Sequence, residues 1–226
     1  MSVRDAWRGS FPQQSAQLVV AYVVNLWGSL VSTPDPHFGW HLNEPDITKR
    51  FKQRLQNGAD SAGISGEWMA ENVSMEFDPV TRAPRKVNRT DIVYFSDRVQ
   101  PTLRLTFEFK KLKDTRASRK AYYGSNGMGR FLAGTYCKTE PFGIMVSVVD
   151  AQSQRVCVDK LKSALRDEDL NSVLNYVPDE HNGAWVREPS REMVELADFD
   201  TQHHRVLAGF ETFMFAHLVL TFPSAS

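Results

Sequence analysis

Residues 103–110 read Leu-Arg-Leu-Thr-Phe-Glu-Phe-Lys, in which apolar and polar side chains alternate without a break. A period of two places the leucines and phenylalanines on one face of a β-strand and the polar side chains on the other. We therefore predict a half-buried strand over 103–110. Glu108 and Lys110 are two residues apart, so they would project from the same polar face of a rigid element.

Further strands and a helix are predicted upstream of this segment. Partial alternation over 68–78 and a second strand over 91–95, joined by a turn at 78–84, predict a hairpin. Before them a helix is expected to begin at Asn43, a favourable N-cap followed by an acid and a proline, and to end near Gly58. Its predicted buried stripe is Ile47, Phe51 and Leu55.

Downstream of the segment we expect a basic loop, a helix over about 128–136 and a buried strand over 143–149. The final apolar stretch, 210–222, fits a strand or a buried helix equally well. The predicted order over 43–149 is helix, strand, strand, strand, helix, strand, so both element types contribute and an α/β fold is expected.

The length and composition favour one globular domain. A chain of 226 residues with 42% hydrophobic and 24% charged residues can bury one continuous core. We expect that single domain to have its core at about 40–150, an N-terminal helix at 15–30 and a C-terminal acidic extension at 151–226.

Cysteine content and the N-terminal segment favour a cytoplasmic protein. Cys137 and Cys157 are too few for a disulfide scaffold, and we expect both to be free thiols. The apolar run over 18–30 is shorter than the roughly 20 residues needed to cross a bilayer. A buried helix is therefore favoured over a signal peptide, and no membrane partner is expected.

Charge is unevenly distributed. The chain contains 27 basic and 27 acidic residues, but the segment 82–138 contains 14 basic and only four acidic ones. A local basic surface suits a phosphate backbone; a solvated face is the alternative. The candidate contacts in it are Lys111, Lys113, Arg119 and Lys120. The neutral total and the acidic tail over 167–200 suggest a protein partner or a homo-oligomer.

Carboxylates flank the Glu108–Lys110 pair. Antiparallel pairing of the predicted strands could bring Asp91 beside Glu108, and Glu44 begins the upstream helix. Oxygen ligands of this kind suit Mg²⁺ or Mn²⁺, and a nearby lysine could orient water or stabilise developing charge. The alternative is an ordinary cross-strand ion pair on a solvated sheet face.

These residues, in the order Glu44, then Arg-Thr-Asp at 89–91, then Phe-Glu-Phe-Lys at 107–110, resemble the PD-(D/E)XK nuclease superfamily over about residues 40–150. The resemblance implies a restriction-endonuclease-like fold, a central mixed sheet flanked by helices. It also implies that Asp91 and Glu108 bind the metal, that Lys110 is the motif lysine and that Glu44 is the acid of the first core helix, a third candidate metal ligand.

Two departures from the superfamily pattern affect the site. Thr90 occupies the position of the motif proline, and no glutamine follows the triplet. The outer residues of the site are therefore chosen as Tyr123, Asn126 and Arg130, which we also count among the candidate nucleic-acid contacts.

The function expected from this resemblance is metal-dependent hydrolysis of phosphodiester bonds in DNA, with RNA less favoured, in a bacterial restriction or anti-phage setting. The alternative is a catalytically silent nuclease-like module that binds nucleic acid or acts as a scaffold. Weaker patterns are a zinc pair at His37 and His41 and a phosphate-binding loop over glycines 124–129.

Overall fold

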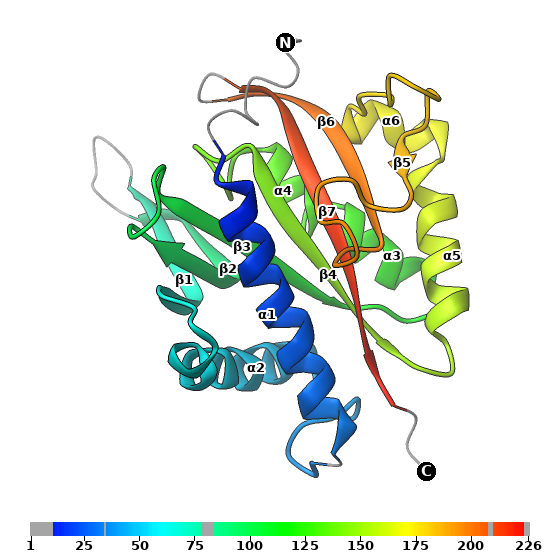
Figure 1. Cartoon of the computed structure of the whole chain (residues 1–226). Coiled ribbons are helices and arrows are strands. Elements are labelled where there is room, and N and C mark those ends of the chain that lie inside the picture. The colour runs from blue at the N-terminus through cyan, green and yellow to red at the C-terminus, as the bar shows by residue number, and fades with distance from the viewer. Residues whose placement is uncertain (1–10, 34, 78–83, 208–209, 224–226) are drawn as a thin grey trace.

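A seven-stranded mixed β-sheet with helices on both faces forms the centre of the molecule (Figure 1). The computed structural model describes residues 11–33, 35–77, 84–207 and 210–223, with side chains except at 71–77, 84–90, 206–207 and 210. The strands are β1 (Glu67–Phe77), β2 (Pro84–Ser96), β3 (Leu103–Lys111), β4 (Phe142–Asp150), β5 (Val186–Arg187), β6 (Phe199–Leu207) and β7 (Phe210–Phe222). The predicted α/β class is confirmed.

The strand order is β1-β2-β3-β4-β7-β6-β5. β1, β2 and β3 form an antiparallel meander, β3, β4 and β7 run parallel to one another, and β6 and β5 return antiparallel. The parallel strands are buried on both faces, which explains the nearly continuous apolar sequences of β4 and β7.

Two layers of helices cover the sheet (Figure 1). α1 (Gln13–Ser32) and α2 (Glu44–Gly58), followed by a 3₁₀ turn at Asp60–Ala62, pack on one face. On the other face lie α3 (Arg116–Tyr123), α4 (Met128–Leu132), α5 (Gln154–Leu165) and α6 (Glu168–Leu174). The apolar side chains of β3 join the α1–α2 core, so Glu108 and Lys110 project toward the α3–α4 side.

The elements around β3 match the prediction closely. The alternating segment is a strand, and α2 begins after Asn43, whose Oδ1 accepts a hydrogen bond from the Asp46 N–H at 2.9 Å. The predicted stripe of α2 is buried. β2 starts earlier than the predicted residue 91, and the predicted turn at 78–84 lies, apart from Pro84, outside the described residues.

The predicted basic loop after β3 is partly wrong, because it contains α3. Thr115 caps this helix, accepting a hydrogen bond from the Ser118 N–H at 3.2 Å. The next helix, α4, is shorter than the predicted 128–136 and ends before Gly134, which adopts a left-handed φ of 67°. Between them the chain turns so tightly that a Cβ on Gly127 would lie 1.8 Å from the carbonyl oxygen of Tyr122.

The C-terminal region builds part of the same sheet. The ambiguous stretch 210–222 is the strand β7, which pairs with β4 in the middle of the sheet. Residues 151–226, which we expected as an extension of a core over 40–150, thus supply three of the seven strands. They also supply α5 and α6.

The N-terminal helix packs one face into the core, as predicted. α1 buries Ala16, Val19, Val20, Val23 and Trp27. With 20 residues it is longer than the predicted 15–30. By length and composition alone it is long and apolar enough to cross a membrane, a criterion that core helices of soluble proteins and signal sequences also meet. The two cysteines are free, as predicted, and both are buried.

Candidate metal and carboxylate site

Strand pairing brings Asp91 and Glu108 together. The antiparallel register opposes Ile92 and Phe107, which places Asp91 next to Glu108 on the face toward α3 and α4. The Oδ2 atom of Asp91 accepts a hydrogen bond from the Phe109 N–H at 2.8 Å. The predicted juxtaposition of these two carboxylates is therefore present, and one of them is locked to the backbone of the neighbouring strand.

Lys110 bridges two carboxylates. Its Nζ atom lies 2.9 Å from Glu108 Oε1 and 3.1 Å from Glu44 Oε1, and it also donates to the carbonyl of Phe109 at 2.9 Å. The other oxygen of Glu44 accepts a hydrogen bond from the Lys111 N–H at 2.6 Å. The start of α2 is thereby tied to the end of β3, and all four predicted residues meet.

Burial strongly affects the acid–base properties of this group. Glu108 is 0% exposed. Desolvation, with the charge of Asp91 in support and the charge of Lys110 in opposition, raises the pKa of Glu108 to about 8. Desolvation also raises the pKa of Asp91, against the opposing effect of Lys110. Burial alone would lower the pKa of Lys110, but the surrounding carboxylates outweigh it and raise that pKa, so the ammonium stays charged.

The raised pKa of Glu108 predicts a pH-dependent stability in EDTA. The folded protein retains a proton on Glu108 up to about pH 8, whereas the unfolded chain loses it near the ordinary value of 4.5. The free energy of unfolding should therefore fall as pH rises from about 4.5 to about 8. Glu108→Gln cannot lose that proton, so its unfolding free energy in urea titrations should fall less than that of the wild type over this window.

The control for this prediction is Glu67→Gln, at an exposed position on β1. This variant should follow the wild-type pH profile. A Glu108→Gln profile that coincides with that of the wild type would show that Glu108 is ionised in the folded protein at neutral pH.

Arg130, one of the outer residues predicted for the site, lies beside Glu108, and Tyr136 contacts Arg130. Arg130 on α4 places Nη1 3.5 Å from Glu108 Oε1 and donates to the hydroxyl of Tyr136. Burial, followed by the charge of Glu108, raises the pKa of Tyr136 to about 12. Sequence reasoning missed Tyr136: it lies beyond the left-handed turn at Gly134, and no local pattern indicates where that turn directs the chain.

The other predicted contacts lie at the end of β3, on α3 and in the segments beside α3. Lys111 is engaged with the loop before α2, since its Nζ donates to the carbonyls of Trp40 and Leu42, the latter at 2.8 Å, and lies 4.1 Å from the Trp40 ring centre. It is therefore a poor candidate for phosphate contact. Of the remaining predicted nucleic-acid contacts, Lys113, Lys120 and Asn126 are exposed and Tyr123 is half-buried. Arg119 places Nη1 3.4 Å from Asp114 Oδ1.

The carboxylates fit a metal only as a pair. Among the described residues, no group of three or more His, Cys, Asp or Glu side chains is arranged to hold a metal ion, so neither Glu44 as a third ligand nor the His37–His41 pair finds support. Glu108 Oε2, however, is buried without a hydrogen-bond partner. Because Mg²⁺ in substrate-bound sites often uses only one or two carboxylates plus phosphate oxygens and water, Asp91 and Glu108 suit it.

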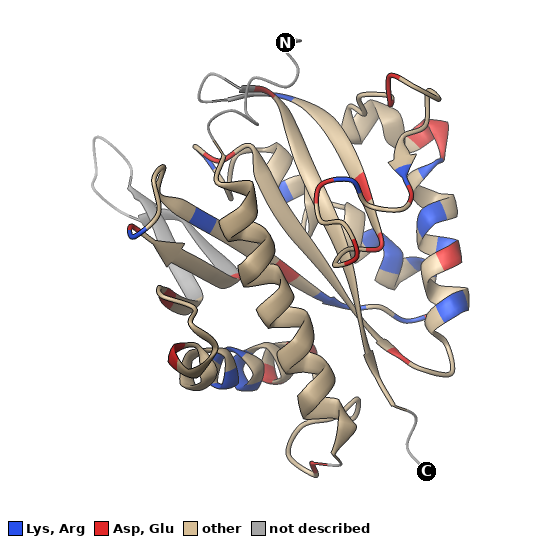
Figure 2. Cartoon of the chain, viewed as in Figure 1, with Lys and Arg blue, Asp and Glu red and all other residues tan. Residues whose placement is uncertain are grey.

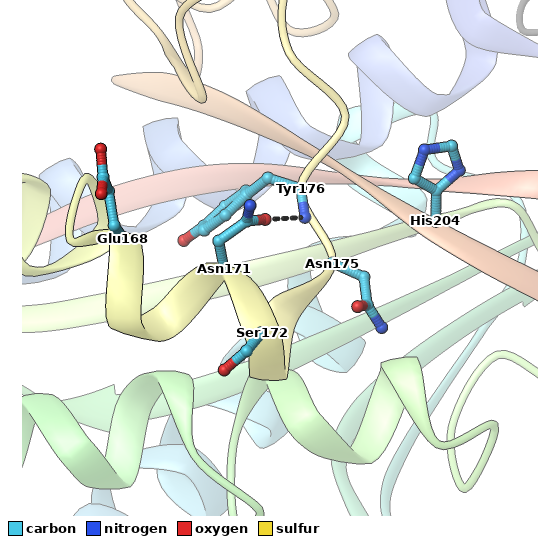
Figure 3. A pocket seen from close by; sticks show the side chains of 6 residues that line it. All are labelled: Glu168, Asn171, Ser172, Asn175, Tyr176 and His204. Carbon is cyan, nitrogen blue, oxygen red and sulfur yellow. Dashed lines mark hydrogen bonds between the residues drawn. The ribbon is translucent and has the colours of Figure 1, made fainter.

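Two other polar regions stand apart from this site. His217 and His203 are buried and linked through Thr201 Oγ1, with Nε2-to-Oγ1 distances of 2.8 Å for each ring, and their other nitrogens contact Tyr122 and the carbonyl of Leu174. Every ring nitrogen is thus satisfied, as in a structural network. A surface hollow at α6 is lined by Glu168, Asn171, Ser172, Asn175, Tyr176 and His204 (Figure 3).

Neither region contains a residue predicted for the site. In the hollow, Asn171 Oδ1 accepts a hydrogen bond from the Tyr176 N–H at 3.0 Å (Figure 3). The carboxylate site at β2, β3 and α2 is therefore the one at which the sequence prediction and the geometry agree. Comparisons of this chain with protein-family models, with curated proteins and with solved structures find no match.

Proposed function

We propose that this protein is a metal-dependent nuclease that hydrolyses phosphodiester bonds, with DNA favoured over RNA as substrate. One observation carries the proposal: Asp91 and Glu108 lie side by side on adjacent strands, Lys110 contacts Glu108 at 2.9 Å, and the buried Glu108 Oε2 has no hydrogen-bond partner in the described part of the chain. An unpaired buried carboxylate oxygen is costly unless a ligand satisfies it.

Each residue of the site has a separate role in this proposal. Asp91 and Glu108 would hold Mg²⁺ or Mn²⁺, which when bound polarises the phosphate and activates water. Asp91 is oriented for this by the Phe109 N–H. Lys110 carries a positive charge at the same place and would orient the attacking water or stabilise charge on the phosphate oxygens. Glu44, hydrogen bonded to Lys110 and to the Lys111 backbone, positions that lysine.

The resemblance to the PD-(D/E)XK superfamily supports this proposal, since its motif residues are the ones that converge here. A restriction-endonuclease-like fold is the corresponding proposal for the mixed sheet with flanking helices. We extend it to a cytoplasmic setting, to restriction or anti-phage defence, and to a protein partner or a second copy that restrains the activity.

A second candidate is a catalytically silent module that binds nucleic acid. The observation that favours it is the charge pairing within the site, because Glu108 already faces both Lys110 and Arg130. Such a network could be a purely structural one in which the carboxylates never meet a cation.

Plasmid cleavage separates the two candidates. Purified protein incubated with supercoiled plasmid should nick it in Mg²⁺ or Mn²⁺ and leave it intact in EDTA, with single-stranded RNA as the parallel substrate. Metal binding measured by calorimetry together with nicking supports the nuclease. Nucleic-acid binding without cleavage or metal binding in any of these conditions supports the silent module.

A further inference from the structure

A second basic element joins the basic segment in space. α5 belongs to the region after residue 150, whose net charge is negative. α5 nevertheless carries basic residues, and it packs beside the basic helix α3 on the same face of the sheet. Figure 2 marks basic residues in blue on the ribbon of the loop after β3, of α3 and of α5, on this side of the molecule. Residues 112–123 and 150–161 together contain six basic and three acidic residues. The basic ones, here called the α3–α5 ridge, are Lys113, Arg116, Arg119, Lys120, Arg155 and Lys160.

The ridge is fixed relative to the carboxylate site. Only Leu112 separates Lys113 from the end of β3, which carries Glu108 and Lys110. Ser118 Oγ accepts a hydrogen bond from the Lys113 N–H at 2.9 Å and donates to the Lys111 carbonyl at 3.2 Å. These two bonds hold the start of α3 against the end of β3. A phosphate backbone bound along the ridge would therefore extend to the carboxylate site.

Asp114 links the two halves of the ridge. Both of its carboxylate oxygens lie 2.8 Å from Lys160 Nζ on α5, and Oδ1 lies 3.4 Å from Arg119 Nη1 on α3. Exposed ion pairs of this kind contribute little to stability. These two cations can therefore exchange Asp114 for a phosphate at small cost.

We propose that the α3–α5 ridge is the path along which the phosphate backbone of duplex DNA leaves the carboxylate site, an inference that rests on the proposed nuclease function. Single-strand binding surfaces use exposed aromatic side chains on which bases stack. The large hydrophobic side chains exposed in the described ranges are Leu18, Val156, Val173 and Val194, none of them aromatic. Cations without stacking partners suit the backbone of a duplex.

The test measures binding separately from cleavage. Fluorescence anisotropy with a labelled DNA duplex, in EDTA and over a series of salt concentrations, gives the dependence of affinity on salt. The double variant Arg155→Ala/Lys160→Ala should bind more weakly, with its slope reduced by about one unit for each phosphate that the variant no longer neutralises. Asp114→Asn should bind more tightly, because it frees Arg119 and Lys160 for phosphate.

The matched control is Lys49→Ala, which removes one exposed cation from α2 on the opposite face of the sheet. It should bind as the wild type does. If the double variant and Asp114→Asn also behave as the wild type, or if the wild type does not bind the duplex at any salt concentration, the ridge is not the DNA path. If the wild type nicks plasmid but the double variant and Asp114→Asn bind DNA as the wild type does, only this inference is overturned. If these variants change DNA binding as expected but the wild type does not nick plasmid, only the proposed nuclease function is overturned.

Discussion

Lys110→Ala is expected to abolish most plasmid nicking while leaving metal affinity equal or slightly higher. The Lys110 ammonium lies 2.9 Å from Glu108 Oε1 and would repel a cation bound there, so its role lies in the transition state rather than in metal binding. Without this charged group the nicking rate should fall by roughly 10²- to 10³-fold. Lys110 also lowers the pKa of Glu108, so its removal should make that carboxylate hold its proton more tightly. Calorimetric metal titration should therefore be done at pH 9, where the proton competes least with the metal.

The metal ligands should behave differently from the lysine. Asp91→Ala and Glu108→Ala should abolish nicking and also weaken Mg²⁺ or Mn²⁺ binding, by more than the roughly 10- to 100-fold that removal of an outer partner of a ligand costs. Lys110→Met, which keeps the length of the side chain, controls for a cavity at Lys110. Wild-type metal binding and nicking by Glu108→Ala would refute the nuclease assignment.

Trp27→Ala is expected to lower the free energy of unfolding by about 3–5 kcal/mol. Trp27 is 2% exposed, and its ring centre lies 5.3 Å from that of Phe38, 5.1 Å from that of Phe51 and 4.7 Å from that of Phe222. Its Nε1–H also donates to the carbonyl of Thr221 at 3.1 Å. The change would therefore loosen α1, α2 and β7 together, as urea denaturation followed by far-ultraviolet circular dichroism would measure.

Leu18→Ala is the matched control, since Leu18 lies on the same helix with 66% of its surface exposed. This exchange should change the unfolding free energy by no more than about 0.5 kcal/mol. Equal, small effects of the two variants would contradict the packing of α1 in the core. They would favour a membrane or leader role for this apolar helix.

Local patterns alone identify the elements closest to the candidate site. The strict alternation over 103–110 predicts β3 and the shared face of Glu108 and Lys110. Asn43 predicts the start of α2 and thus the position of Glu44. These predictions succeed because a period of two and a helix cap are properties of a few consecutive residues.

Shorter or irregular elements are less predictable. α3 falls within the predicted loop because its sequence is mostly polar and only Tyr122 of its eight residues is buried. The signal that could have found it is the capping pair Thr115 and Ser118, which the lack of an apolar stripe conceals. The end of α4 depends on the left-handed Gly134, one of several glycines in that region with no pattern to distinguish it.

Local sequence patterns predict the α/β class, β3 and α2, and they single out Asp91, Glu108, Lys110 and Glu44 as candidate site residues. Only the folded structure shows that Glu108 is fully buried, that Tyr136 contacts Arg130 beside it, and that α5 lies beside α3. It also decided that residues 210–222 form β7, paired in parallel with β4. Periodicity reports which face of an element is buried, but pairing between segments some 70 residues apart depends on how the whole core packs, which no local pattern encodes.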